Sequence, residues 1–396
     1  MQQAFSRRSF LRGIGAVGLL TALSSCTRVP QMAANGLPAQ TVWSTYPTGT
    51  GTYNDVAALA NMLTNRSGMT VRLMTSDTGI GRVGPLINET ARYARTGDEY
   101  YYAFEGDDEF ASETWGPQPL RMMWTPPGNY GVLVREDSGI ENVSDLRGKR
   151  YPRLISSISM NRKLEAILNF EGLTLDDVEL VDLGYAEQAE AMKTGQLDAM
   201  YQNVVGGAIE ELNSEYPIRW LDLGDGTPEQ YSTWEELAPN VIVGEFENGV
   251  GMEPGEVGRN MQYSIPLTIM ADHPTAEVKE ILHMFWDNFD DFKDATPDAH
   301  KFSPDEVMLL PLVVPFHEGT VEFFKEIGRW TPGLQRRNDA LLEREQLMQE
   351  QWPTFWAENS EADNPSELWR AWKRENLPAL PEVNDVDPPS TIEGKA

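Results

Sequence analysis

The sequence is poor in the residues that crosslink chains or bind metals. It has one cysteine, Cys26, among 396 residues, which excludes an internal disulfide and any site built from several cysteine ligands. The four histidines show no metal-ligand spacing, and neither a Gly-x-Ser-x-Gly motif nor a Walker loop occurs. We therefore predict no metal, no cofactor and no enzymatic activity, with a hydrolase as the minor alternative. His317 is interpreted as a structural histidine.

Basic residues are also scarce. The chain has 32 Lys and Arg against 61 Asp and Glu, a net charge of −29. Its first 26 residues contain Arg7, Arg8 and Arg12 and no acid, so the remainder carries 29 basic against 61 acidic residues, or −32. A body this acidic repels nucleic acid and anionic membrane surfaces, and we expect neither as a partner. The acidity suits salty surroundings, where a Debye length of about 8 Å or less screens self-repulsion, or serves solubility alone.

No apolar run is long enough to span a bilayer, which takes about 20 residues. The run from Gly13 to Leu23 follows the paired arginines and precedes Ser24-Ser25-Cys26. This arrangement resembles a twin-arginine lipoprotein signal ending in a lipobox, over residues 1–26. The resemblance implies cleavage before Cys26 and lipidation of its thiol, which anchors the protein outside the cytoplasmic membrane. A free or buried thiol is the alternative. Residues 27–40 are expected to form a tether.

The segment Thr41–Leu63 predicts a strand, a tight loop and a helix. Gly49 and Gly51 allow the backbone to bend and a ligand to approach. Thr52 is expected to cap the helix, with Asp55 completing a capping box. The unpaired N–H groups of such a helix end accept carboxylates or phosphates if the loop lines a cleft. The alternative is a turn without a ligand.

Strands and helices alternate after this point. A sheet of parallel strands in each of two lobes is the arrangement that this alternation predicts, with ligands at the carboxyl ends of the strands. The expected strands are Thr70–Met74, Glu99–Phe104, Tyr130–Arg135, Val178–Leu183, Leu197–Tyr201 and Ile265–Met270. The expected helices are Val83–Arg95, Met160–Glu171, Ala186–Thr194, Thr275–Phe289 and Asn338–Phe355.

The predicted fold class is therefore α/β, with two Rossmann-like lobes and a ligand cleft between them. Residues 41–132 and 265–330 are assigned to lobe I, and residues 133–264 to lobe II. Residues 331–396 form an acidic extension with helical character. Its four tryptophans are expected to pack on the body as a cluster, with partner docking as the alternative. Disorder is expected from Asn384 onward.

Four segments of the chain are similar to motifs of one family. They are Thr48–Tyr53, Ser138–Arg150, Tyr185–Ala199 and Pro315–Glu326. In this order they resemble the TAXI group of solute-binding proteins, the extracytoplasmic receptors of tripartite ATP-independent periplasmic (TRAP) transporters. The resemblance covers about residues 40 to 330. It implies a type II-like periplasmic binding protein that holds a small organic solute, such as glutamate or another carboxylate, and delivers it to a TRAP permease in the membrane. A receptor for another transporter or a sensor, and a non-transport surface lipoprotein, are the alternatives.

The predicted ligand-binding residues lie in the loops that follow the strands. Thr50 stands where the family has glycine, and Arg82 lies in a loop that departs from the family pattern. Arg82 is predicted to form a bidentate pair with a carboxylate, while a surface arginine that balances acids is the alternative. The full predicted set is Gly49, Thr50, Gly51, Thr52, Tyr53, Thr78, Arg82, Ser156, Ser157, Ser159, Tyr201 and Asn203.

Overall fold

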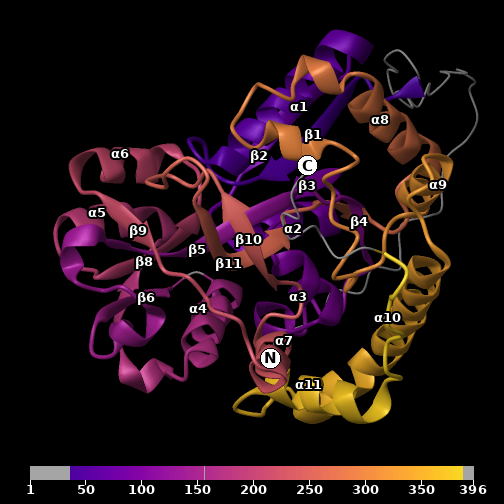
Figure 1. Cartoon of the computed structure of the whole chain (residues 1–396). Coiled ribbons are helices and arrows are strands. Elements are labelled where there is room, and N and C mark those ends of the chain that lie inside the picture. The colour runs from indigo at the N-terminus through magenta and orange to yellow at the C-terminus, as the bar shows by residue number, and fades with distance from the viewer. Residues whose placement is uncertain (1–35, 156, 387–396) are drawn as a thin grey trace, which may run out of the picture.

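A mixed five-stranded sheet is the centre of the half that we call the first lobe (Figure 1). The structure is a computed structural model that describes residues 36–155 and 157–386; the predicted export signal, Cys26 and Ser156 lie outside them. The strand order is β2-β1-β3-β12-β4, with β1 parallel to β2 and β3, and β12 antiparallel to its neighbours. The bounds are β1 Gln40–Thr45, β2 Thr70–Thr75, β3 Tyr93–Arg95, β4 Leu120–Trp124 and β12 Leu267–Met270.

The second lobe is built on an antiparallel sheet of order β10-β11-β5-β8, on which β9 pairs with β5. A separate parallel pair, β6 and β7, lies beside it. The prediction of a parallel sheet in this half was therefore wrong, except for that pair. The bounds are β5 Pro127–Arg135, β6 Arg150–Leu154, β7 Glu179–Leu183, β8 Ala199–Asn203, β9 Ile218–Trp220, β10 Ile242–Glu247 and β11 Val257–Ser264.

Two short crossings connect the lobes. The chain leaves the first sheet after β4 and enters the second at β5; it returns from β11 to β12. Strand β12 therefore enters the first sheet between β3 and β4, late in the chain. This order and the double crossing give the type II arrangement of a two-lobed α/β binding protein, as predicted.

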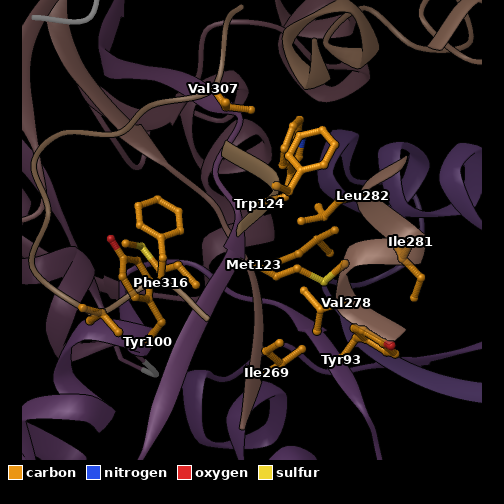
Figure 2. Close-up of a cluster of buried hydrophobic side chains, with 14 of the residues drawn as sticks. Tyr93, Tyr100, Met123, Trp124, Ile269, Val278, Ile281, Leu282, Val307 and Phe316 are labelled. Carbon is orange, nitrogen blue, oxygen red and sulfur yellow. The ribbon is translucent and has the colours of Figure 1, made fainter. Parts of the chain in front are cut away.

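Helices cover both faces of the first sheet. Helices α1 and α8 share a buried cluster with Trp43 and Tyr93 on one face, and α2 and α3 pack with Ala94 and Leu120 on the other. Figure 2 shows part of the larger cluster, where Trp124 and Met123 lie against Val278 and Leu282 of α8. The helices are α1 Gly51–Ser67, α2 Gly79–Ile87, α3 Glu99–Glu105, α4 Ile158–Phe170, α5 Gln188–Lys193, α6 Gly207–Glu215, α7 Pro228–Leu237, α8 Thr275–Asp287, α9 Glu318–Glu326, α10 Pro332–Asn359 and α11 Pro365–Asn376.

The C-terminal extension packs on the first lobe, and Figure 1 shows α10 and α11 wrapping around one side of it. Trp352 and Trp369 are buried in the first-lobe cluster, which confirms the packing interpretation of the tryptophans. The Trp369 indole N–H donates to the Glu105 carbonyl at 2.8 Å. Buried charges fix the same contact: Lys373 binds Glu105 at 2.6 Å and Asp107 at 2.8 Å. The extension is thus part of the first-lobe core.

Two local predictions were wrong in type. Glu99–Phe104 was expected to be a strand and is helix α3, because its aromatic residues are buried on two sides: Tyr100 and Phe104 in one cluster, Tyr102 in another. A segment buried on both sides has no clear helical period. Val83–Arg95 was expected to be one helix, but α2 ends at Ile87 and β3 begins at Tyr93.

One smaller feature also differs from expectation. The predicted tether reaches into the folded body, since Leu37 is fully buried and Gln40 begins β1. Among the described residues, no helix combines the length and apolar character needed to cross a membrane.

Candidate functional site

The first sheet has a topological switch point between β1 and β3. Strand β2 lies on one side of β1 and β3 on the other, and Trp43 and Ser44 pair with Tyr93 and Ala94. The next residues along the two strands are Thr45 and Arg95, which end them at the same edge. In open α/β sheets, ligands bind outside the carboxyl ends of the strands at such a point. This edge is therefore the candidate site.

Helix α1 begins directly above this edge. Its N-cap is Thr50, whose hydroxyl oxygen accepts the Tyr53 N–H at 3.2 Å and donates to the Pro47 carbonyl at 2.8 Å. The prediction that Thr52 is the cap was wrong, and Asp55 makes no capping box; its carboxylate accepts the Thr296 hydroxyl at 2.5 Å. Thr50 thus serves as a cap where the resembling family has glycine.

Tyr130 of β5 joins the two lobes at this edge. Tyr130 pairs with Asn203, at the end of β8, across the second sheet, and the side chains of Asn203 and of Thr52, from α1, both influence the pKa of its hydroxyl. Burial raises the pKa of Tyr130, and hydrogen bonding with Asn203 and Thr52 opposes that rise. Asn203 also accepts the Val205 N–H at 3.0 Å. Two predicted site residues from different lobes are therefore neighbours.

Arg82 is buried and paired. Its Nε donates to the Glu99 carboxylate at 2.6 Å, and its guanidinium lies 3.9 Å from the Tyr46 ring centroid. Both charged side chains are 2% exposed, so the interpretation of Arg82 as a surface arginine was wrong. Burial opposes ionisation of Glu99, but the Arg82 charge and the hydrogen bonds from Arg82 and the Gly97 N–H hold the pKa of Glu99 below its usual value. Binding of a ligand by Arg82 stays a prediction.

The second-lobe wall is the N-terminus of α4. Ser157 caps this helix by accepting the Met160 N–H at 3.3 Å. Ser159 donates to the Asp98 carboxylate at 3.1 Å, and Lys163 pairs with the same carboxylate at 2.7 Å. Asp98 follows β3 in the first lobe, so these contacts hold the lobes together over the candidate site. Lys163 and Asp98 are 1% and 2% exposed, which places the pair inside the junction.

The remaining predicted residues are divided between the core and the loops. Tyr201 is fully buried and its hydroxyl lies 2.7 Å from that of Tyr263, so it packs in the second-lobe core behind the junction. Thr78 is exposed and caps α2, accepting the Gly81 N–H at 3.1 Å. Gly49 and Gly51 are exposed in the loop before α1, and Tyr53 is half-buried in its first turn.

Sequence reasoning missed three buried charges at the junction. Asp98 and Lys163 lie 65 residues apart, and no local pattern relates them. Arg95 was placed inside an expected helix, although it ends β3. The only sequence signal was the polar run Arg95-Thr96-Gly97-Asp98 after an apolar segment. A short buried strand followed by polar residues would have indicated a strand end at the ligand edge.

A cavity of about 590 Å³ lies next to the junction. Asn129 and Gln262 from the second sheet form one wall, and Asp298 and Lys301 from a first-lobe loop form another. The lining also includes Asn129 and Val204, which are next to Tyr130 and Asn203 in the chain, so the cavity adjoins these two residues. Within residues 36–155 and 157–386, no cluster of three or more His, Cys, Asp or Glu side chains is arranged to hold a metal ion.

Several solved structures align with most of the chain at low identity. The periplasmic aliphatic sulphonate binding protein SsuA from Escherichia coli is 15% identical, with 91% of this chain and 98% of that chain covered and a TM-score of 0.41. A putative L-cystine ABC transporter from Listeria monocytogenes is 14% identical, with coverages of 68% and 98% and a TM-score of 0.39. The glutamate complex of the GluR0 ligand-binding core from Nostoc punctiforme is 11% identical, with coverages of 65% and 99% and a TM-score of 0.38. Because these superpositions are loose, the fold rests on the sheet order above.

The sequence itself matches a family model. The match extends over residues 45–328, from the end of β1 to just beyond α9, and includes the switch point and both crossings. It leaves out the extension formed by α10 and α11. This chain belongs to the NMT1-like family.

Proposed function

We propose that this protein is an extracytoplasmic solute receptor that captures a small organic solute between its lobes and delivers it to a membrane transporter. The observation that carries the proposal is the buried polar junction at the carboxyl edge of the first sheet, where Asp98 of one lobe meets Ser159 and Lys163 of the other. A purely structural lobe contact is more economically built from apolar side chains, since burying charges is costly.

The connectivity supports a receptor that opens and closes. In the part of the chain that the structure describes, only the two crossings, between β4 and β5 and between β11 and β12, carry the backbone from one sheet to the other. Separation of the lobes breaks the Asp98 contacts and exposes Tyr130, Thr52 and Asn203 to solvent. A solute that binds both walls stabilises the closed form in proportion to its preference for that form. Closure is then the signal that a membrane partner reads.

The test is a thermal-shift screen of the purified full chain against amino acids, dicarboxylates and keto acids. A solute present at 100 times its dissociation constant adds about 2.7 kcal/mol to the free energy of unfolding. We expect at least one solute to raise the melting temperature and calorimetry to give a 1:1 stoichiometry. A panel without any stabilising solute contradicts the receptor proposal and favours a non-transport lipoprotein.

The finer assignments have their own tests. We propose a TRAP permease as the partner, on the strength of the four TAXI-like segments, and the genes beside this one distinguish it from another transporter or a sensor. Export and anchoring are tested by mass spectrometry of the mature N-terminus. The expected species begins at a lipidated Cys26, and an unmodified Cys26 within the intact chain contradicts the anchor.

A further inference from the structure

Arg95 differs from every other buried lysine or arginine that the structure describes. Five such side chains are buried: Arg82, Arg95, Arg121, Lys163 and Lys373. Four of them pair with a carboxylate, namely Glu99, Glu345, Asp98 and the Glu105–Asp107 pair respectively. Arg95 is 4% exposed, yet no described carboxylate oxygen lies within 4.0 Å of its guanidinium. Buried charges are normally paired, and Arg95 has no such pair among the described residues.

The polar contacts of Arg95 confirm that it is undersatisfied. One terminal nitrogen donates to the Ile265 carbonyl in the crossing to β12, and the guanidinium carbon lies 4.8 Å from the Phe302 ring centroid. Its Nε is buried without any hydrogen-bond partner among the described residues. The same holds for the hydroxyl oxygen of Thr45. Thr45 and Arg95 project to one face of the sheet, because each lies two residues beyond the strand partners Trp43 and Tyr93, whose rings are in contact.

The nearest acidic groups are already committed elsewhere. Asp55 is the strongest charge acting on Arg95, but its carboxylate accepts the Thr296 hydroxyl at 2.5 Å. Burial raises the pKa of Asp55 to about 6, so its carboxylate loses its charge only below neutral pH. Asp298 pairs with Lys301 at 2.8 Å. Neither acid gives Arg95 the direct, two-pronged contact that a guanidinium favours.

We propose that Arg95 is the anion-recognition residue of the solute site, and that the solute carries a carboxylate or an equivalent oxoacid head group that binds at the switch point between β1 and β3. This inference rests on the proposed receptor function and specifies its ligand. The head group pairs with the Arg95 guanidinium and accepts a hydrogen bond from the Thr45 hydroxyl. Strand β1 ends at Thr45 and α1 begins at Gly51, so a head group on the Thr45 hydroxyl lies next to the start of that helix. That helix end favours negative charge as well.

The proposal makes Arg95 rather than Arg82 the discriminating cation. Arg82 already pairs with Glu99 through Nε and donates from Nη1 to the Ser76 carbonyl at 3.2 Å, so its charge is balanced within the protein. Arg95 loses no ion pair when it binds a solute carboxylate. A charge-assisted contact of this kind strengthens binding by about 10- to 100-fold over no contact at all.

The experiment compares acids with their neutral analogues. Wild type, Arg95→Gln, Arg95→Lys and the control Arg121→Gln are titrated by calorimetry with monocarboxylates, dicarboxylates, amino acids and alkylsulfonates, each beside its amide or sulfonamide. We expect wild type to prefer the acid by at least 10-fold, Arg95→Gln to lose that preference, and Arg95→Lys to recover part of it. Arg121→Gln removes another buried arginine, which lies outside the site and pairs with Glu345, and it should keep the preference.

A second readout separates recognition from a structural role. Removing an unpaired buried cation is expected to leave the melting temperature of the solute-free Arg95→Gln protein unchanged or higher, while its solute-induced rise disappears. An unchanged acid-to-amide ratio in Arg95→Gln, or a wild type that prefers neutral solutes, overturns the inference and leaves the receptor proposal intact. Failure of every solute, charged and neutral, to bind wild type overturns both. If Arg95→Gln does not fold, the inference is tested by two remaining measurements: the acid-to-amide preference of wild type and its partial loss in Arg95→Lys.

Discussion

The buried Lys163–Asp98 pair is expected to contribute to the free energy of unfolding by holding the two lobes together when no solute is bound. Lys163→Met leaves the Asp98 carboxylate with only the Ser159 hydroxyl, in a junction where both charged side chains are almost fully buried. Breaking a buried pair by removing one partner costs about 3–5 kcal/mol, because the remaining charge is uncompensated. Asp98→Asn leaves the Lys163 ammonium in the same position. Each single variant is therefore expected to lose about 3–5 kcal/mol of unfolding free energy, unless the lobes open and hydrate the charge.

The double variant separates burial of charge from loss of a contact. Lys163→Met combined with Asp98→Asn removes both charges and keeps an acceptor for Ser159, so its unfolding free energy should return to within about 1 kcal/mol of wild type. A matched control is the Arg153–Asp182 pair, which lies wholly within the second lobe and in which both side chains are 52% exposed. The same double-mutant cycle at this exposed pair should give an interaction energy of about 0.2–1 kcal/mol.

The assays are urea unfolding followed by tryptophan fluorescence, and small-angle X-ray scattering of the folded variants. If a single variant opens the lobes, its radius of gyration rises and its loss of stability is limited to the free energy of opening. Single variants within about 1 kcal/mol of wild type, with unchanged scattering, would refute the reasoning. That outcome means that the pair is already solvated and that the solute-free protein is open.

Three further predictions concern other parts of the chain. His317 accepts the Gly319 N–H at Nδ1 at 3.1 Å and lies with Nε2 2.9 Å from the His273 carbonyl, and burial lowers its pKa to about 4. As pH falls from about 6.5 to 4, the unfolded chain therefore takes up a proton that the folded protein does not. The free energy of unfolding should fall by up to about 3 kcal/mol in wild type, and urea titrations of His317→Asn should not show this fall. Asp55 contributes with the opposite sign over part of that window, so the comparison is between the two proteins at each pH. Trp369→Ala should cost about 3–5 kcal/mol in urea unfolding, against less than half of that for the more exposed Trp356→Ala. Arg82→Gln should lose about 3–5 kcal/mol by leaving Glu99 unpaired; an unchanged dissociation constant for every solute rejects Arg82 as a ligand contact.

The elements predicted well from the sequence are those with one buried face. Helices α1 and α8 bury one side against the first sheet and expose the other, so their apolar period is visible in the sequence. Strand β2 alternates in the same way. The prediction was wrong for α3 because this helix lies between two buried clusters. It was wrong for β3 because a strand of three residues is too short to show a period. Burial on all sides removes the pattern that sequence reasoning needs.

The candidate site was predicted by place but not by chemistry. The loop before α1 was located correctly because glycine, threonine and the amphipathic helix are adjacent in the sequence. The charges at the junction come from Arg95, Asp98 and Lys163, which are brought together only by β3 and α4 in the folded chain. No neighbouring sequence pattern distinguishes Asp98 from the other acidic residues, of which the chain has 61 in all. Which arginine is paired depends on non-local contacts, so Arg82 was chosen for its loop and Arg95 was missed.

The charge balance of the whole chain sharpens the role of one unpaired cation. With a net charge of −29 the body repels anions at long range, so an anionic solute is selected only where a local positive group outweighs that field. Surface cations cannot do this, because water and salt screen them and acidic neighbours outnumber them. A buried guanidinium acts in a medium of low polarity, where a direct contact is stronger. The four paired cations hold the fold together and leave no net charge for a ligand, whereas Arg95 keeps its charge at the edge where the lobes meet. An acidic receptor can therefore select acidic solutes, provided that the Arg95 guanidinium pairs with the solute and not with a carboxylate of the protein.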